Sequence, residues 1–121
     1  MALTTEVTPL EENRVRLDVA VPGDEVRRQM ERAVRQLGRE VRVPGFRPGK
    51  APAEVIVQRV GREAVVQEML KGALGGWYSE AVSEAGVVPI DDPELDLEDV
   101  PEDGDLTFTA KVHVRPKATL G

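Results

Sequence analysis

The sequence contains no cysteine, a single histidine and only four aromatic residues among its 121 positions. Without cysteine the chain can form no disulfide, no catalytic thiol and no thiolate metal site. With so few rings, a core must be built mainly from Val, Leu, Ala and Met. The one histidine, His113, lies on the expected polar face of a strand, where an exposed strand residue is a simpler interpretation than a catalytic base or metal ligand.

Long apolar runs are also missing. No stretch approaches the roughly 20 apolar residues that a membrane-spanning helix needs. The first residues do not combine a basic segment with an apolar one, as a secretory signal does. We therefore expect a cytoplasmic protein with no membrane contact.

Charge is separated along the chain, although the formal net charge is only −6. Residues 27–62 hold ten Arg or Lys and three Glu, whereas residues 80–105 hold eleven Asp or Glu and no basic residue. The separation favours a polyanionic partner for the basic segment, while an ordinary solvated surface explains it equally well. The carboxylates of residues 91–105 lack the ligand spacing of a calcium loop. We expect no metal and no cofactor.

Alternation of apolar and polar residues predicts the strands. The clearest is residues 106–115, and residues 15–21 show the same period. Residues 3–7 form a further candidate, which turns back through a hairpin at residues 9–13. Residues 95–100 offer a short edge strand with its leucines inward and its carboxylates outward.

Helical spacing predicts three helices between these strands. Asp24 can cap the first helix, whose apolar stripe runs from Val26 to Val41. The opposite face carries arginines at steps of three and four, namely Arg28, Arg32, Arg35, Arg39 and Arg42. Pro44 and Gly45 end this helix.

A short helix is predicted over residues 53–60 and a long one over residues 62–85. The glycines Gly72, Gly75 and Gly76 weaken the long helix, so they indicate either close packing or a kink. Together these elements predict an α+β fold of one domain over residues 1–121. An antiparallel sheet would be covered on one face by the long helix, with a protruding helix-loop-helix arm around residues 24–60.

The loop between the first two helices combines one aromatic ring with two cations, in the order Gly45-Phe46-Arg47-Pro48-Gly49-Lys50. Its glycines allow backbone angles closed to other residues, and its proline removes freedom that would otherwise be lost on binding. The pattern therefore favours a rigid loop that presents Phe46 as an apolar anchor. Composition alone leaves a second interpretation open, in which Phe46 folds back onto the core and the cations keep the loop soluble. A nucleotide-binding loop is excluded, because the glycines lack the required spacing to the lysine.

The pattern Gly-Phe-Arg-x-Gly-Lys-x-Pro, placed between two helices after an amino-terminal hairpin, resembles the signature of the trigger factor family, in its N-terminal ribosome-binding domain. The resemblance extends to Gln58-Arg59-Val60-Gly61 and to the order of strands and helices, so it covers essentially the whole chain. It implies that the loop docks on the large ribosomal subunit beside the peptide exit tunnel.

The resemblance also implies residue roles. Phe46 would be the apolar anchor, and Arg47 would pair with an acidic side chain of an exit-site ribosomal protein, the large-subunit protein twenty-three. Lys50 would contact acidic or phosphate groups, and Gly45 and Gly49 would set the loop shape. Some family members carry a cation where this chain has Pro48, so the resemblance does not carry an RNA contact to that position. The basic face of the first helix would assist, through Arg28, Arg35, Arg39 and Arg42.

Trigger factor is a chaperone in which an isomerase domain and a substrate-binding domain follow the docking domain. The resemblance therefore implies that this chain is the docking part of a longer protein and is not itself an enzyme. Nascent polypeptides and ribosomal RNA would be further partners. Apolar surface left between the helical arm and the sheet could drive free copies to form a homodimer. A generic RNA-binding module and a stand-alone peptide holdase stay open as alternative functions.

Overall fold

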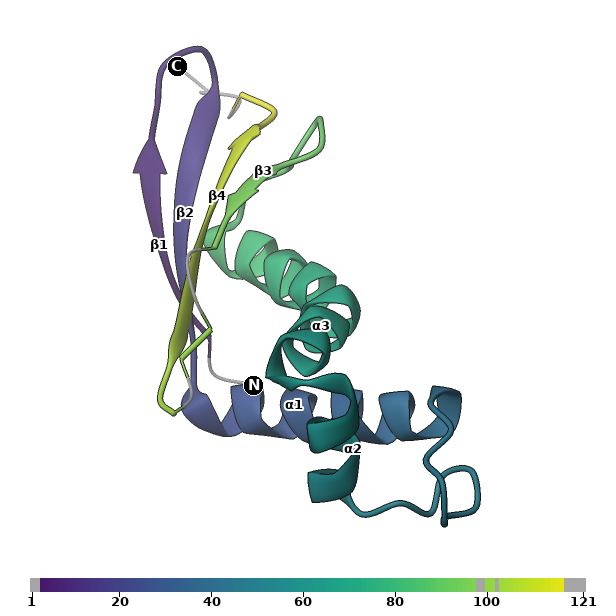
Figure 1. Cartoon of the computed structure of the whole chain (residues 1–121). Coiled ribbons are helices and arrows are strands. Elements are labelled where there is room, and N and C mark those ends of the chain that lie inside the picture. The colour runs from purple at the N-terminus through teal and green to yellow at the C-terminus, as the bar shows by residue number, and fades with distance from the viewer. Residues whose placement is uncertain (1–2, 98–99, 102, 117–121) are drawn as a thin grey trace. The chain divides into compact units, whose positions relative to one another are not determined.

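The computed structural model describes residues 3–97, 100–101 and 103–116. Its elements follow in the order β1 (Thr4–Pro9), β2 (Arg14–Val21), α1 (Gly23–Glu40), α2 (Ala53–Val60), α3 (Arg62–Ala85), β3 (Glu94–Asp96) and β4 (Leu106–His113). Figure 1 traces them along the chain. The chain divides into two compact units, a sheet unit of Met1–Gly23 with Trp77–Gly121 and a helical unit of Asp24–Gly76. The predicted α+β class is confirmed.

The sheet unit is built on four antiparallel strands in the order β1-β2-β4-β3 (Figure 1). Its core follows from the alternation in β2 and β4, because the register sets each buried residue of one strand opposite a buried residue of the other. Leu17 lies opposite Ala110, and Val19 lies opposite Phe108. Trp77 from α3 is also buried in this unit, with only 1% of its surface exposed. The two strands predicted most clearly therefore form the centre of the sheet.

The hairpin between β1 and β2 was predicted, and β1 runs two residues further than expected, to Pro9. Its turn places Glu12 at φ 61° and Asn13 at φ 59°. The Arg14 N–H donates to the Glu11 carbonyl at 3.3 Å. Positive φ at both central residues is the geometry of a type I′ turn, which matches the twist of the two strands it joins.

The edge strand differs from its prediction. β3 spans Glu94–Asp96, and residues 98 and 99 of the predicted strand lie outside the described residues. Leu95 pairs with Ala110 and so faces the covered side of the sheet, but it remains 38% exposed. A three-residue strand at a sheet edge has neighbours on one side only, so the expectation of a buried leucine is wrong. β4 likewise ends at His113, and Val114 instead forms an isolated bridge with Pro89.

The helical unit is held by apolar side chains from all three helices. Its buried hydrophobic residues are Val26, Ala33, Val34, Val43, Ile56, Val65, Val66, Met69 and Ala73. α1 ends at Glu40, one residue before the predicted stripe ended. The described helices include none whose length and apolar character would let it span a bilayer.

Candidate functional site

All six residues of the predicted site, Gly45 to Lys50, are exposed in the loop between α1 and α2 (Figure 1). Phe46 is 44% exposed. The interpretation in which this ring is sealed in the core is therefore wrong. Arg47 and Lys50 form no ion pair with any described residue. The loop thus presents one ring and two cations to solvent.

Two consecutive turns shape this loop. The Phe46 N–H donates to the Val43 carbonyl at 3.2 Å across Pro44-Gly45, and the Lys50 N–H donates to the Arg47 carbonyl at 2.9 Å across Pro48-Gly49. The glycines have φ +88° and +79°. Proline followed by a residue of positive φ is the pattern of a type II turn, where proline fixes the first central angle and glycine supplies the second.

Phe46 and Arg47 lie between these turns, so the two residues with the largest side chains are flanked on both sides by a hydrogen-bonded turn. Pro48 has a defined task here, because it occupies the first central position of the second turn. The turn chemistry can be read from the two Pro-Gly pairs in the sequence.

One bond ties the loop to the preceding helix. The Gly49 N–H donates to the Gly38 carbonyl at 3.2 Å. Gly38 lies in the last turn of α1, where backbone carbonyls lack a partner within the helix. The bond therefore satisfies a free carbonyl and anchors the second turn. Gly38 was not predicted as part of the site, since no local pattern links positions eleven residues apart.

Of the four arginines of the predicted basic face, Arg28, Arg35 and Arg39 lie on α1, whereas Arg42 follows the end of the helix at Glu40. Arg28, Arg35, Arg39 and Arg42 are exposed. Arg28 is tied to its own helix through an ion pair of 3.5 Å between its Nη2 and the Oε1 of the buried Glu25. Arg35, Arg39 and Arg42 form no ion pair within the described residues.

Arg32 departs from this face. Its Nε donates to Gln29 Oε1 at 2.8 Å, and its guanidinium lies against Gly72 of α3. Inclusion of Arg32 in an exposed ridge is therefore wrong, because the missing side chain of Gly72 leaves room for the guanidinium inside the helical unit.

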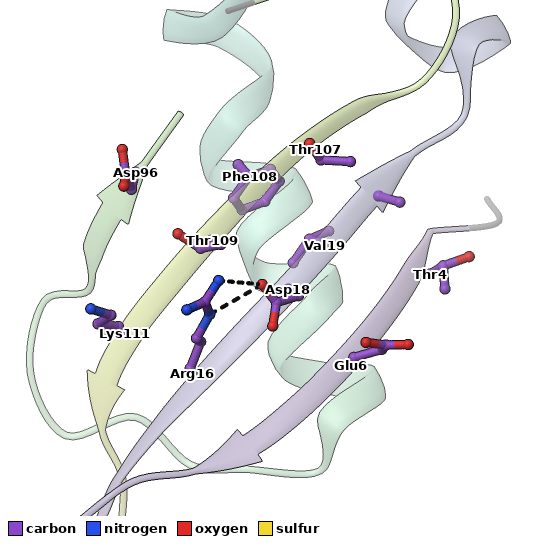
Figure 2. A pocket seen from close by; sticks show the side chains of 11 residues that line it. Thr4, Glu6, Arg16, Asp18, Val19, Asp96, Thr107, Phe108, Thr109 and Lys111 are labelled. Carbon is purple, nitrogen blue, oxygen red and sulfur yellow. Dashed lines mark hydrogen bonds and ion pairs between the residues drawn. The ribbon is translucent and has the colours of Figure 1, made fainter. Parts of the chain in front are cut away.

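Apart from the loop, the sheet unit holds a hollow of about 720 Å³ on the polar face of the sheet (Figure 2). Threonines and charged residues from all four strands line most of it. Arg16 and Asp18 point toward one another there and form an ion pair of 3.1 Å, between Nη2 and Oδ1. The hollow has no histidine and pairs no nucleophile with a base, so its chemistry is that of a solvated sheet surface.

His113, the only histidine, has a structural partner. Its Nδ1 lies 2.7 Å from Asp91 Oδ2, and its backbone N–H donates to Asp91 Oδ1 at 3.2 Å. The Ile90 N–H donates to the His113 carbonyl at 3.0 Å. These bonds hold the segment before β3 against β4. Across the described residues, no three His, Asp or Glu side chains gather as they would around a metal ion.

Fold and loop together define an α+β domain that presents a preorganised, cationic loop with an exposed ring. Comparison with known proteins agrees with the resemblance to the trigger factor family. A family model described as "Bacterial trigger factor protein (TF)" matches residues 1–121. Trigger factor of Mycolicibacterium smegmatis is 41% identical over 118 residues, which cover 98% of this chain and 25% of the relative. Trigger factor of Rhodococcus opacus is 44% identical over 119 residues, which again cover 98% of this chain and 25% of the relative.

A solved structure of the trigger factor chaperone covers 94% of this chain and 27% of its own, with a TM-score of 0.75 and 24% identity. This likeness supports the fold. The chain therefore belongs to the bacterial trigger factor family, a family of chaperones, and corresponds to its N-terminal domain. It spans about a quarter of the length of the curated relatives that it matches.

Proposed function

We propose that this chain docks a chaperone on the large ribosomal subunit beside the peptide exit tunnel, through the 45–50 loop. The observation that carries the proposal is the exposed Phe46 between two Pro-Gly turns, with free cations at Arg47 and Lys50. A rigid loop loses little conformational freedom on binding, so more of its contact energy appears as affinity. Membership of the trigger factor family supports the same partner.

Each side chain has a role in this proposal. Phe46 inserts into an apolar pocket of the partner, a burial worth about 1.5–3 kcal/mol. Arg47 pairs with an acidic side chain of the exit-site protein, the large-subunit protein twenty-three, and a hydrogen bond to a charged group contributes about 1.5–3 kcal/mol. Lys50 contacts acidic or phosphate groups. Arg35, Arg39 and Arg42 add attraction toward ribosomal RNA, and Arg28 adds less because of its ion pair.

The remaining parts of the proposal concern the longer protein. The docked chaperone would receive nascent polypeptides in the cytoplasm, and isomerase activity would belong to a separate domain. The chain itself would supply attachment rather than catalysis, within a single docking domain over residues 1–121. Free copies would pair as homodimers.

Co-sedimentation with purified large ribosomal subunits tests the docking. The F46A/R47A/K50A variant should no longer co-sediment, with its thermal unfolding nearly unchanged because all three side chains are exposed. A matched control is V88A/K71A/R115A, which also removes one exposed apolar side chain and two exposed cations, none of them in the loop. Equal binding by both variants would contradict the proposal. Crosslinking from position 47 would then identify the component contacted.

A generic RNA-binding module is the second candidate, favoured by the exposed arginines of α1. Such a module would lose affinity for any RNA in proportion to the cations removed in R28A/R35A/R39A, with a steep salt dependence. The docking proposal instead expects intact large subunits to be preferred over free RNA, and expects the F46A variant to lose that preference.

A further inference from the structure

We infer that Gly38 of α1 and Ile56 of α2, which both lie outside the 45–50 loop, are a matched pair that positions this loop for docking. The inference rests on the proposed function, because docking is what the positioned loop performs. It starts from an unexpected residue, a glycine inside a helix. Glycine is unfavourable there because it loses more backbone freedom than other residues, so its presence calls for a packing reason.

Ile56 supplies that reason. A β-carbon at position 38 would stand 2.6 Å from the Ile56 Cδ1 and 3.8 Å from its Cγ1. Ile56 is only 3% exposed. Only a residue without a β-carbon at position 38 lets α2 approach α1 this closely while Ile56 keeps its place. The steric clash of such a β-carbon would involve the terminal Cδ1 carbon alone.

The same glycine holds the loop. The Gly38 carbonyl accepts the Gly49 N–H at 3.2 Å, the one backbone hydrogen bond that joins residues 45–50 to α1 in the part of the chain that the structure describes. Gly38 therefore meets α2 through its bare α-carbon and the second turn of the loop through its carbonyl. A change in how α2 packs on α1 would therefore move Gly38, whose carbonyl holds the turn from Arg47 to Lys50 in place.

A hollow of about 180 Å³ lies beside this bond, with Gly38, Gly49, Ala51 and Ile56 among its lining residues. Ile56 lines this hollow, so a carbon displaced by a methyl group at position 38 can move into it. Gly38 and Gly49 line the same hollow, so the displaced carbon would move beside the hydrogen bond that joins them.

Three variants of the 121-residue chain test the pair: G38A, I56V and the double variant G38A/I56V. The double variant restores the match, because valine lacks the Cδ1 carbon that the new methyl would meet. The control is G75A, which also places alanine at a helical glycine but meets no atom within 4 Å. Two measurements follow the loop, the hydrogen-exchange rate of the Gly49 amide by NMR and the affinity for purified large subunits.

In G38A the Gly49 amide should exchange several-fold faster and the affinity should fall several-fold, since added core atoms force neighbours to shift. G75A should stay near the original values, whereas I56V, which leaves a gap where the buried Cδ1 carbon stood, should change both values by less than G38A does. G38A/I56V should recover both the slow exchange and the affinity. If G38A alone fails to fold, recovery of folding and of Gly49 protection in the double variant still tests the match.

Unchanged Gly49 exchange in a folded G38A would overturn the inference, as would a double variant that behaves like G38A. A different result would concern the proposed function alone. If Gly49 exchange follows the expected pattern while F46A/R47A/K50A still binds ribosomes, the pair positions the loop but the loop does not dock the chain.

Discussion

The guanidinium of Arg32 in α1 lies against Gly72 in α3, with its Cζ 2.8 Å from the point where a β-carbon at position 72 would stand. The Arg32 Nη2 is buried and makes no hydrogen bond to a described residue, while its Nε donates to Gln29. Gly72 thus has a packing function. The neighbouring Gly75 and Gly76 are exposed and meet no atom within 4 Å.

The first prediction compares these glycines. Gly75→Ala should raise the free energy of unfolding by up to about 1 kcal/mol, the difference in helix propensity between the two residues. Gly72→Ala should raise it less, because the new methyl must displace Arg32. Urea denaturation measures both changes. In an R32A background the two substitutions should give equal gains, and a persistent difference would show that Arg32 is not the cause.

The sequence predicts the centre of this fold well because local patterns encode it. The alternation of β2 and β4 and the helical spacing of α1 and α3 each reflect one face turned toward a core. The errors concern contacts between distant positions. Periodicity assigned Arg32 to a polar face but could not show that its guanidinium would pack against Gly72, forty residues later. In the same way, the Pro89–Val114 bridge and the buried Val43 have no local signal.

In the candidate site, too, the local features were predicted and the contact between distant positions was not. The composition of residues 45–50 predicts a stiff loop but leaves open whether Phe46 points outward, and the Pro-Gly pairs account for both turns once hydrogen bonds are seen. The anchor at Gly38 was missed, since its effect depends on how α2 packs on α1. Sequence thus gives the groups that a partner would meet, and the structure adds what holds them in place.

A second prediction concerns the β1–β2 hairpin. Glu12 has φ 61°, a left-handed conformation that costs an ordinary L-residue about 1–2 kcal/mol. Asparagine tolerates this region better and is frequent in type I′ turns. Glu12→Asn should therefore raise the free energy of unfolding by about 0.5–1 kcal/mol, since it lowers part of that cost. The control is Glu11→Asn, one position earlier and without positive φ. An equal effect of both substitutions in chemical denaturation would contradict the turn assignment.

A third prediction uses Tyr78, the only tyrosine in the chain. Burial raises its pKa above the usual 10.0, and the negative charges of Asp91 and Asp92 raise it further. Absorbance of the phenolate reports this residue alone. The folded chain should titrate at higher pH than the urea-unfolded chain, and Asp92→Asn should reduce the difference. Coincident titrations of folded and unfolded chains would contradict the assignment.

The raised pKa also fixes the sign of a stability change. The folded state favours the neutral phenol, so its contribution is fully present below pH 10.0 and is lost as pH rises through the folded pKa. The free energy of unfolding should therefore decline more steeply above pH 10.0 in the original chain than in Tyr78→Phe, which has no phenolic proton to lose. Denaturation series from pH 8 to 11 compare the two slopes.

The last prediction separates the stiffness of the 45–50 loop from its chemical groups. Pro48→Ala leaves the ring and both cations in place but frees the backbone before Gly49. A proline at a compatible position is worth about 0.4–1 kcal/mol of conformational entropy, so affinity for large subunits should fall about two- to fivefold. Gly49→Ala forces a β-carbon into φ +79°, at a cost of about 1–2 kcal/mol. The affinity should then fall about five- to thirtyfold, as about 1.4 kcal/mol corresponds to tenfold.

A matched control for strain is Gly104→Ala in the sheet unit, where φ is +95° and no atom lies within 4 Å. This substitution should lower stability and leave ribosome affinity unchanged, because residue 104 lies outside the loop. Gly49→Ala should instead lower ribosome affinity and leave stability nearly unchanged, because an exposed loop distorts without disturbing the core. Should Gly49→Ala and Pro48→Ala both bind as tightly as the original chain, a preformed loop shape would not be what the partner recognises, and the exposed ring and cations alone would have to account for docking.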